Sequence, residues 1–341
     1  MELCNLGTLI QSKMHILIVH DQKIPVTGYG GTERVIWGLA KSLKELGHQI
    51  TFLVPQGSTC PFASVLTWNP HLSVNEQIPE SVDVVHFNHT PLGEISKPYV
   101  VTIHGNFGGD IKLNINSIFV SKNQANRYGS DSFVHNGLDW SDYGKPNLSQ
   151  NRTHFHFLGK AAWRVKNVQG AIDTILQSPN EQLAVLGGTR LNLKMGFRMT
   201  WSSRIQFYGT VGGQQKLDLL SESKGLVFPV RWNEPFGLAI TESLYFGCPV
   251  FATPYGSIPE LITPEFGFLS DQQEEMAEAI SHASDYNKQD CHSYARDVFD
   301  ALSMAKKYLK AYESVLNGKC LNTQEPQLLD KQTPKFLPWN K

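Results

Sequence analysis

The chain has 341 residues, of which 41% are hydrophobic and 18% are charged, and its formal net charge is −1. This length favours two hydrophobic cores over one, and the composition is that of an ordinary globular protein. The near-zero net charge excludes the broad basic field that nucleic-acid binding requires, so any anion must be bound in a local pocket.

The cysteine pattern and the lack of long apolar runs both favour a cytoplasmic protein. The five cysteines are scattered and never form a Cys-x-x-Cys pair, which argues for reduced thiols and against a disulfide framework or a zinc site. No stretch reaches the roughly 20 apolar residues that a membrane helix needs, and residues 1–13 lack the pattern of a secretory signal. We expect a cytoplasmic protein with no evident membrane contact, in which residues 1–13 form an extension with little structure.

The first half of the chain alternates short apolar strands with loops and helices. An apolar run at 15–20 leads through a glycine-bearing loop into a helix that Thr32 can cap, and a strand at 49–54 follows. Further strands are expected at 82–87, 99–104, 117–120 and 132–135. This alternation is typical of an α/β doubly wound parallel sheet.

A second alternating series follows a polar stretch at 137–153, which indicates an interdomain linker. Its strands are expected at 154–158, 182–186, 204–208, 226–230 and 249–252. Its helices are expected at 168–177, 214–221, 237–246, 272–282 and 291–316. We therefore predict domains at 14–145 and 146–300, followed by a tail at 321–341 that lies across a surface or is disordered.

The most informative stretch runs from Glu234 to Glu242 and carries two carboxylates eight positions apart. A proline and a glycine between them predict a helix start, which places Glu234 at the mouth of the helix and Glu242 about two turns along it. The backbone N–H groups of Phe236, Gly237 and Leu238 would then point outward at the positive end of the helix, which favours anions. A nucleoside diphosphate sugar presents the hydroxyls and the diphosphate that these groups could hold.

This segment resembles the Glu-x7-Glu motif of retaining glycosyltransferases with the GT-B fold, most closely glycosyltransferase family 4. The resemblance implies two Rossmann-like domains facing a cleft, with the last helix, at about 300–320, packing back on the first domain. It also implies that Glu234 holds hydroxyls of the donor sugar and Glu242 holds the ribose. On this motif alone, two carboxylates that merely flank a surface helix are an open alternative.

Two segments of the first half also resemble this family. Gly30 and Gly31 precede the first helix, where glycines let the backbone approach a phosphate, although an ordinary strand-to-helix turn would look the same. His104 ends a strand, so it faces the crevice beyond the strand ends, and the resemblance places it near the donor sugar. The alternative is a histidine satisfied by the local backbone. His86 and His89 lack a third metal ligand and indicate structural or acceptor-side roles.

A basic cluster follows the strand at 154–158. Lys160 stands where the family typically has an arginine, and Lys166 follows it by six residues instead of five. Lysine cannot make the two parallel hydrogen bonds of a guanidinium, so whether Lys160 or Arg164 replaces the arginine stays open. Without a metal, fixed cations must stabilise the leaving diphosphate, whereas the plain alternative is a solvated basic turn.

The remaining observations concern the binding of the nucleotide base and of a divalent metal ion. Thr210 and Val211 resemble the family turn near the nucleotide base, and no Asp-x-Asp pair is present to hold a divalent metal. We therefore expect no metal and no cofactor, with the nucleotide sugar as the substrate.

The hypothesis is a retaining, metal-independent, hexosyltransferase-type enzyme of glycan, glycoconjugate or polysaccharide biosynthesis that uses a UDP- or GDP-sugar. Two alternatives are a GT-B nucleotide-sugar 2-epimerase and a non-catalytic sugar-nucleotide-binding protein. The acceptor, whether a glycan, a lipid-linked intermediate or a small molecule, is not identified. His104, Lys166 and Glu234 would be catalytic, and the donor would be bound by Gly30, Gly31, Lys160, Arg164, Thr210, Val211, Phe236, Gly237, Leu238 and Glu242.

Overall fold

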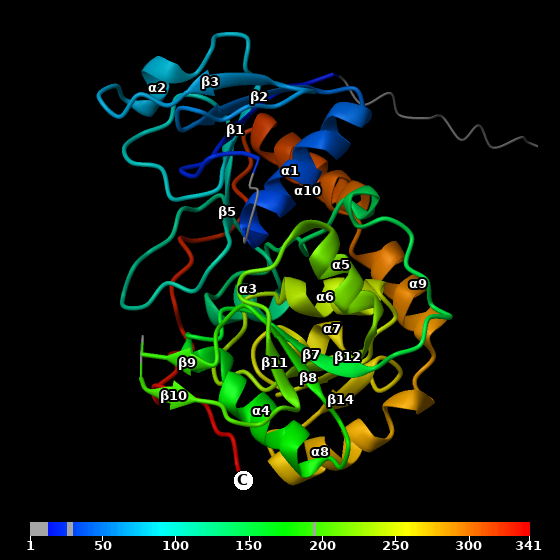
Figure 1. Cartoon of the computed structure of the whole chain (residues 1–341). Coiled ribbons are helices and arrows are strands. Elements are labelled where there is room, and N and C mark those ends of the chain that lie inside the picture. The colour runs from blue at the N-terminus through cyan, green and yellow to red at the C-terminus, as the bar shows by residue number, and fades with distance from the viewer. Residues whose placement is uncertain (1–12, 26–29, 194–195) are drawn as a thin grey trace, which may run out of the picture.

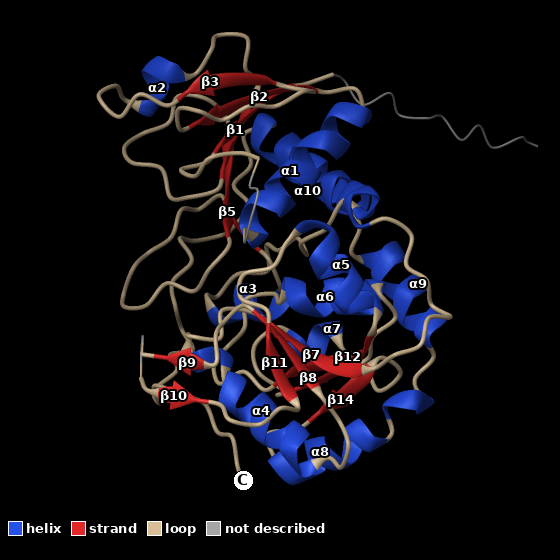
Figure 2. Cartoon of the chain, in the orientation of Figure 1, coloured by secondary structure: helices blue, strands red, loops and turns tan. Residues whose placement is uncertain are grey.

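Two six-stranded parallel sheets organise the chain, one in each half (Figure 1). The computed structural model describes residues 13–25, 30–193 and 196–341. The expected extension at 1–13 therefore lies almost wholly outside the described residues. Helices cover both faces of the second sheet, whereas one face of the first sheet is covered mainly by loops (Figure 2). The α/β fold class is confirmed.

The first sheet has the strand order β3-β2-β1-β4-β5-β6. Strand β1 (His15–Val19), in the middle of this sheet, is buried along its whole length, which explains its continuous apolar sequence. The strands are β1 (His15–Val19), β2 (Gln49–Val54), β3 (Ser64–Thr67), β4 (Val84–Phe87), β5 (Tyr99–Ile103) and β6 (Ser117–Phe119). The helices of this half are α1 (Gly31–Glu45), α2 (Val74–Gln77) and α3 (Lys122–Arg127), followed by the 3₁₀ turn η1 (Trp140–Tyr143).

The second sheet has the order β11-β8-β7-β12-β13-β14, and a separate two-stranded hairpin β9-β10 lies beside it. The strands are β7 (His154–Leu158), β8 (Leu183–Leu186), β9 (Leu191–Asn192), β10 (Arg198–Met199), β11 (Ile205–Phe207), β12 (Ser223–Phe228), β13 (Val250–Ala252) and β14 (Gly267–Leu269). The helical segments are η2 (Arg164–Lys166), α4 (Val168–Gln177), α5 (Gly213–Ser221), α6 (Leu238–Tyr245), α7 (Ile258–Leu261), α8 (Gln273–Ser281), η3 (Ala283–Asp285), α9 (Lys288–Val298) and α10 (Ala301–Leu316).

Several sequence expectations about these elements are wrong. The stretch at 132–135 is not a strand, because only Phe133 makes a single bridge with Phe119. The first helix begins at Gly31 with Gly30 as its cap residue, so Thr32 lies inside it. Strands β3 and β14 were not expected, because both are short and neither shows a distinctive apolar pattern.

The expected long helix at 291–316 is two helices with a break at Asp300. The Asp300 carboxylate accepts hydrogen bonds from the backbone N–H groups of Leu302 and Ser303 and so starts α10 afresh. At this break the chain passes Leu138, whose N–H donates to Phe299 and whose carbonyl accepts from Ala301. The break lets α10 leave the second half and pack on α1 and β5 of the first.

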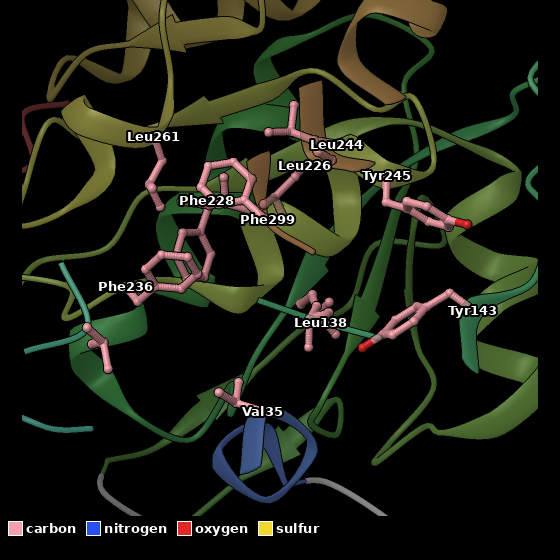
Figure 3. Packing of buried hydrophobic residues seen from close by; sticks show 14 of the residues in the cluster. Val35, Leu138, Tyr143, Leu226, Phe228, Phe236, Leu244, Tyr245, Leu261 and Phe299 are labelled. Atoms are coloured by element: carbon pink, nitrogen blue, oxygen red, sulfur yellow. The ribbon is translucent and has the colours of Figure 1, made fainter. Parts of the chain in front are cut away.

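The hydrophobic core is continuous between the two halves. Val35 of α1, Leu138 and Tyr143 of the linker, and Phe236 and Tyr245 of the second half belong to one buried cluster, part of which is shown in Figure 3. Trp140 stacks on the Tyr245 ring with 4.2 Å between ring centroids. The linker is therefore a packed element that fixes the orientation of one sheet relative to the other.

The tail after α10 is ordered against both halves. Leu113 donates a backbone hydrogen bond to Pro326 in the first half. Further along, Leu337 donates to Arg231 of the second half, and Trp339 is buried there. Of the two forms that the sequence left open for this tail, the one that lies across a surface is therefore observed.

Candidate functional site

A cavity of about 310 Å³ opens between the two halves, at the carboxyl ends of the parallel strands. Loops and helix starts from both sheets line it, as expected for a site in an open α/β fold. Gly30 and Thr210 directly precede lining residues, whereas Lys160 and Arg164 do not line the cavity. Of the residues predicted from the sequence, those that line it are Gly31, His104, Lys166, Val211, Glu234, Phe236, Gly237, Leu238 and Glu242.

Glu234 is buried and held from three directions. Lys166 donates from Nζ to Glu234 Oε2 at 2.6 Å, and Trp232 donates from Nε1 to the same oxygen at 2.8 Å. The Glu234 backbone forms a bridge with Gly256. Since both donors use Oε2, Oε1 is left to accept hydroxyl protons from a ligand in the cavity.

Glu242 collects three donors on its Oε1 atom. They are Lys216 Nζ of α5 at 2.5 Å, Arg34 Nη1 of α1 at 2.6 Å, and the Tyr143 hydroxyl at 2.6 Å. Burial raises the pKa of Glu242, but the charges of Lys216 and Arg34 outweigh it, and the pKa falls to about 2. This carboxylate is therefore ionised at neutral pH and can only accept hydrogen bonds.

Helix α6 begins later than the sequence indicated. Leu238 is its first residue and Gly237, with φ of 94°, is its cap, so Pro235 lies before the helix and not in its first turn. The left-handed backbone of Gly237 interrupts the helical path at this point. The first hydrogen bond of this turn runs from the Ile240 N–H to the Gly237 carbonyl, so the N–H groups of Gly237 and Leu238 precede it and have no partner within the helix.

His104 reaches the cavity from the end of β5. Asn88 donates its side-chain amide to Val19, so its Oδ1 accepts from Nε2 of His104 at 2.9 Å. This assignment leaves Nδ1 of His104 as a hydrogen-bond acceptor. Burial lowers the pKa of His104 to about 3, so the ring is neutral at physiological pH.

The other two histidines that the sequence singled out lie outside the cavity. His86 is fully buried between the hydroxyls of Thr102 and Tyr312, each 2.7 Å from a ring nitrogen, so it is structural. His89 packs edge-on against Trp68 and Phe87.

The side chains of the basic cluster, Lys160, Arg164 and Lys166, do not lie together in the structure. Lys166 enters the cavity, whereas the ammonium of Lys160 lies over the Trp163 ring at 4.7 Å. Arg164 lies in a neighbouring cavity with its guanidinium over the Phe336 ring of the tail, 4.9 Å from the centroid. Neither Lys160 nor Arg164 therefore lines the cavity between the two halves.

The residues that the sequence analysis missed include Arg34, Lys216 and Trp232, which line the cavity, and Tyr143, which contacts Glu242. Arg34 lies one turn into α1 behind the Gly30–Gly31 pair, and Trp232 lies two residues before Glu234, so proximity to a recognised motif could have indicated both. Lys216 and Tyr143 carry no such signal, because only the packing of α5 and of the linker brings them to Glu242.

Two features are absent from the part of the chain that the structure describes. There, no three histidine, cysteine, aspartate or glutamate side chains come together in a group that could hold a metal ion. No helix among the described residues is long and apolar enough to cross a membrane.

Residues 144–297 match the family described as glycosyl transferases group 1. The chain is also similar to an uncharacterized 41.2 kDa protein in the cps region of Klebsiella pneumoniae, with 27% identity over 125 residues. That match covers 35% of this chain and 35% of the relative, so it spans about a third of the relative's length.

Solved structures resemble the chain over most of its length. AviGT4, a glycosyltransferase involved in avilamycin A biosynthesis, is 19% identical with a TM-score of 0.72, and the match covers 89% of this chain and 98% of that one. Anabaena HepE in complex with UDP and glucose is 15% identical with a TM-score of 0.63, and the match covers 88% of this chain and all (100%) of HepE. The fold is GT-B.

Proposed function

We propose that the chain, of which residues 144–297 match the family of glycosyl transferases group 1, transfers a sugar from a nucleoside diphosphate sugar to an acceptor hydroxyl. One observation carries the proposal. Two buried, ion-paired carboxylates, Glu234 and Glu242, flank the free N–H groups at the start of α6 inside one cavity. This arrangement suits two sets of hydroxyls with a diphosphate between them.

The donor would lie along α6. The diphosphate would accept from the N–H groups of Gly237 and Leu238 and pair with Lys166 and Lys216, which line the cavity. Glu242 would accept from the ribose hydroxyls, and Glu234 from the hydroxyls of the sugar. HepE was solved with UDP and glucose, which supports testing uridine nucleotides first.

The reaction would proceed with retention on one face of the sugar. The bond from the anomeric carbon to the diphosphate oxygen breaks, and the acceptor oxygen forms a bond to the same carbon. The acceptor proton passes to an oxygen of the leaving diphosphate, while Lys166 and the helix-start N–H groups stabilise the charge that develops there. His104, which is neutral, would accept a hydrogen bond at Nδ1 and orient the sugar. No metal is required by this scheme.

A thermal-shift panel of nucleotides and nucleotide sugars, with and without a chelator, tests the donor site. A nucleotide at a hundredfold excess over its dissociation constant adds about 2.7 kcal/mol to the free energy of unfolding. We expect one nucleotide class to raise the melting temperature equally with and without the chelator. No shift with any nucleotide contradicts the donor site, and a shift that disappears with the chelator contradicts the metal-free scheme.

Product analysis separates this function from its alternatives. Transfer to an acceptor, with the anomeric configuration assigned by NMR, supports the retaining transferase. Conversion of the donor into its 2-epimer without acceptor supports the epimerase, and nucleotide binding without any turnover supports a non-catalytic role.

A further inference from the structure

The tail after α10 crosses from the first half back to the second, where the chain ends (Figure 1, red). It arrives beside two short segments that carry an ion pair of the cavity. One is the η2 turn, which ends at Lys166, and the other is the loop after β12, which carries Glu234. Gln332 of the tail accepts a hydrogen bond from the backbone N–H of Asn233, directly before Glu234, at 3.3 Å. The tail therefore contacts the support of the ion pair.

Phe336 of the tail contacts an arginine from each of these two segments. The guanidinium of Arg164, in η2, lies 4.9 Å from the centroid of the Phe336 ring. The guanidinium of Arg231, in the loop after β12, lies 5.3 Å from the same centroid. A guanidinium within about 6 Å of a ring centroid is attracted to the ring electrons. One aromatic ring therefore links both segments.

Backbone hydrogen bonds continue this link as far as the residue before Lys166. The Leu337 N–H donates to the Arg231 carbonyl at 2.9 Å, and Arg231 Nε donates to the Leu337 carbonyl at 2.8 Å. The Arg231 N–H in turn donates to the Val165 carbonyl at 2.7 Å. The tail, the loop after β12 and η2 therefore form one hydrogen-bonded series.

The position of the ion pair depends on both segments, because Lys166 Nζ and Glu234 Oε2 lie only 2.6 Å apart. The η2 turn has three residues, and the hydrogen bonds of such a 3₁₀ turn are poor in geometry, so contacts from outside hold it in place. Neither Phe336 nor the two arginines that it contacts line the cavity. The ring can therefore influence the chemistry only through the residues that it holds.

We propose that Phe336 is a positioning residue for sugar transfer, an inference that rests on the proposed function. Its ring holds η2 and the loop after β12 at the separation at which Lys166 meets Glu234. Arg164, which the sequence placed at the diphosphate, acts in this arrangement as the η2 side of the link. A displacement of about 1 Å in a reacting group lowers a rate by up to about 100-fold, so the tail contributes to turnover without touching the substrate.

Kinetics of tail variants test the role of the ring. Phe336→Leu keeps an apolar side chain but removes the ring, and we expect kcat to fall about tenfold. The thermal shifts caused by UDP and GDP should stay those of the wild type, because Glu242 and the start of α6 are unchanged. Phe336→Tyr keeps the ring and should restore kcat. Leu329→Ala alters a 61% exposed residue of the same tail and is the control with normal kcat.

A double-mutant cycle tests whether the ring acts through Arg164. If it does, Phe336→Leu and Arg164→Gln remove the same contact, so their combination should lower kcat by less than the product of the two single losses. Single losses that multiply overturn the proposal. So does a kcat of Phe336→Leu equal to that of the wild type, or a kcat of Phe336→Tyr as low as that of Phe336→Leu.

Hydrogen–deuterium exchange without any donor tests the link itself. The peptide that contains the Arg231 amide, which donates to Val165, should exchange faster in Phe336→Leu and at the wild-type rate in Leu329→Ala. Unchanged exchange in Phe336→Leu with an active wild type contradicts the role of Phe336 and leaves the transferase proposal intact. Faster exchange in Phe336→Leu with a wild type that turns over no donor contradicts the transferase proposal and leaves the link between the tail and the ion pair intact.

Discussion

At the scale of single residues, the site is built from carboxylates that are ion-paired with cations from other elements. Glu242 pairs with Lys216 of α5 and Arg34 of α1, and Glu234 pairs with Lys166 of η2. Glu234 and Glu242 are both buried, so removing a cationic partner leaves an uncompensated buried charge. The same groups therefore fix the geometry of the cavity before any ligand enters it.

Glu234→Gln is expected to keep the fold, at a cost in stability from the unpaired Lys166, and to lower the transfer rate. The glutamine oxygen still accepts from Trp232, but it loses the charge that pairs with Lys166 and the strength of its hydrogen bonds to the sugar. We expect kcat to fall by about 100-fold, which corresponds to about 2.7 kcal/mol of transition-state stabilisation. Initial rates of nucleotide release measure the effect.

Glu181→Gln is the matched control for this substitution. Glu181 is also ion-paired, with Lys224 at 2.7 Å, but it lies outside the cavity. Its turnover should equal that of the wild type. Full activity in Glu234→Gln, with normal folding by circular dichroism, would remove Glu234 from the mechanism.

At the scale of elements, the position of Glu234 depends on the bridge to Gly256. Gly256 has φ of 66°, and a Cβ atom there would lie 2.3 Å from the backbone nitrogen of Glu234. Because the obstacle is backbone, no side-chain movement can relieve it. The turn before α7 therefore sets the place of the carboxylate at the cavity.

Gly256→Ala should destabilise the protein by about 2–4 kcal/mol, as left-handed strain adds to the clash, and should reduce turnover. Urea unfolding and initial rates measure the two effects. Gly318→Ala is the control, because Gly318 has a similar φ of 70° and open space around it. Gly318→Ala should lower the free energy of unfolding by about 1 kcal/mol and leave turnover normal. Equal behaviour of the two variants would show that the clash plays no part.

At the scale of the whole molecule, hydrogen bonds and ion pairs connect the two domains on either side of the cavity. Arg34 and Tyr143 reach Glu242 from one side, and Asn106 donates to the Asn233 carbonyl at 2.7 Å. Glu260 accepts from the backbone N–H groups at the start of α3. These contacts and the returning α10 couple the two domains across the cavity.

Stability should fall as the pH drops below about 6.5. Burial lowers the pKa of His86, His104 and His156 to about 3 from an ordinary value of 6.5. Between these values the unfolded chain binds protons that the folded chain does not, so stability is present above pH 6.5 and is lost on acidification. Well below pH 6.5, each histidine contributes about 1.4 kcal/mol per pH unit to this loss.

Urea unfolding at a series of pH values measures the slope of the unfolding free energy against pH. His156, which lies between the hydroxyls of Ser223 and Ser243, offers the test, because it does not line the cavity between the two halves. His156→Gln should lower stability at neutral pH and flatten the slope by about 1.4 kcal/mol per pH unit. A slope equal to that of the wild type would show that His156 titrates normally in the folded state.

The amino-acid sequence by itself determined the alternating α/β architecture, the segment from Glu234 to Glu242 and the histidine at the end of β5. These features are local, since strand periodicity, helix starts and motif spacing are written in neighbouring residues. Sequence reasoning erred where long-range contacts override local pattern, as in the helix break at Asp300 and the late start of α6 at Leu238.

Only the tertiary structure decided which cations meet which carboxylates. Arg34 and Lys216 reach Glu242 from positions 208 and 26 residues away in the chain, so no local pattern could pair them. Packing likewise turned Arg164 toward Phe336 of the tail. Pairing of β9 with β10 places Leu191 directly beside Met199. Charge pairing and ring contacts depend on distances in space, and these are set by the packing of whole elements.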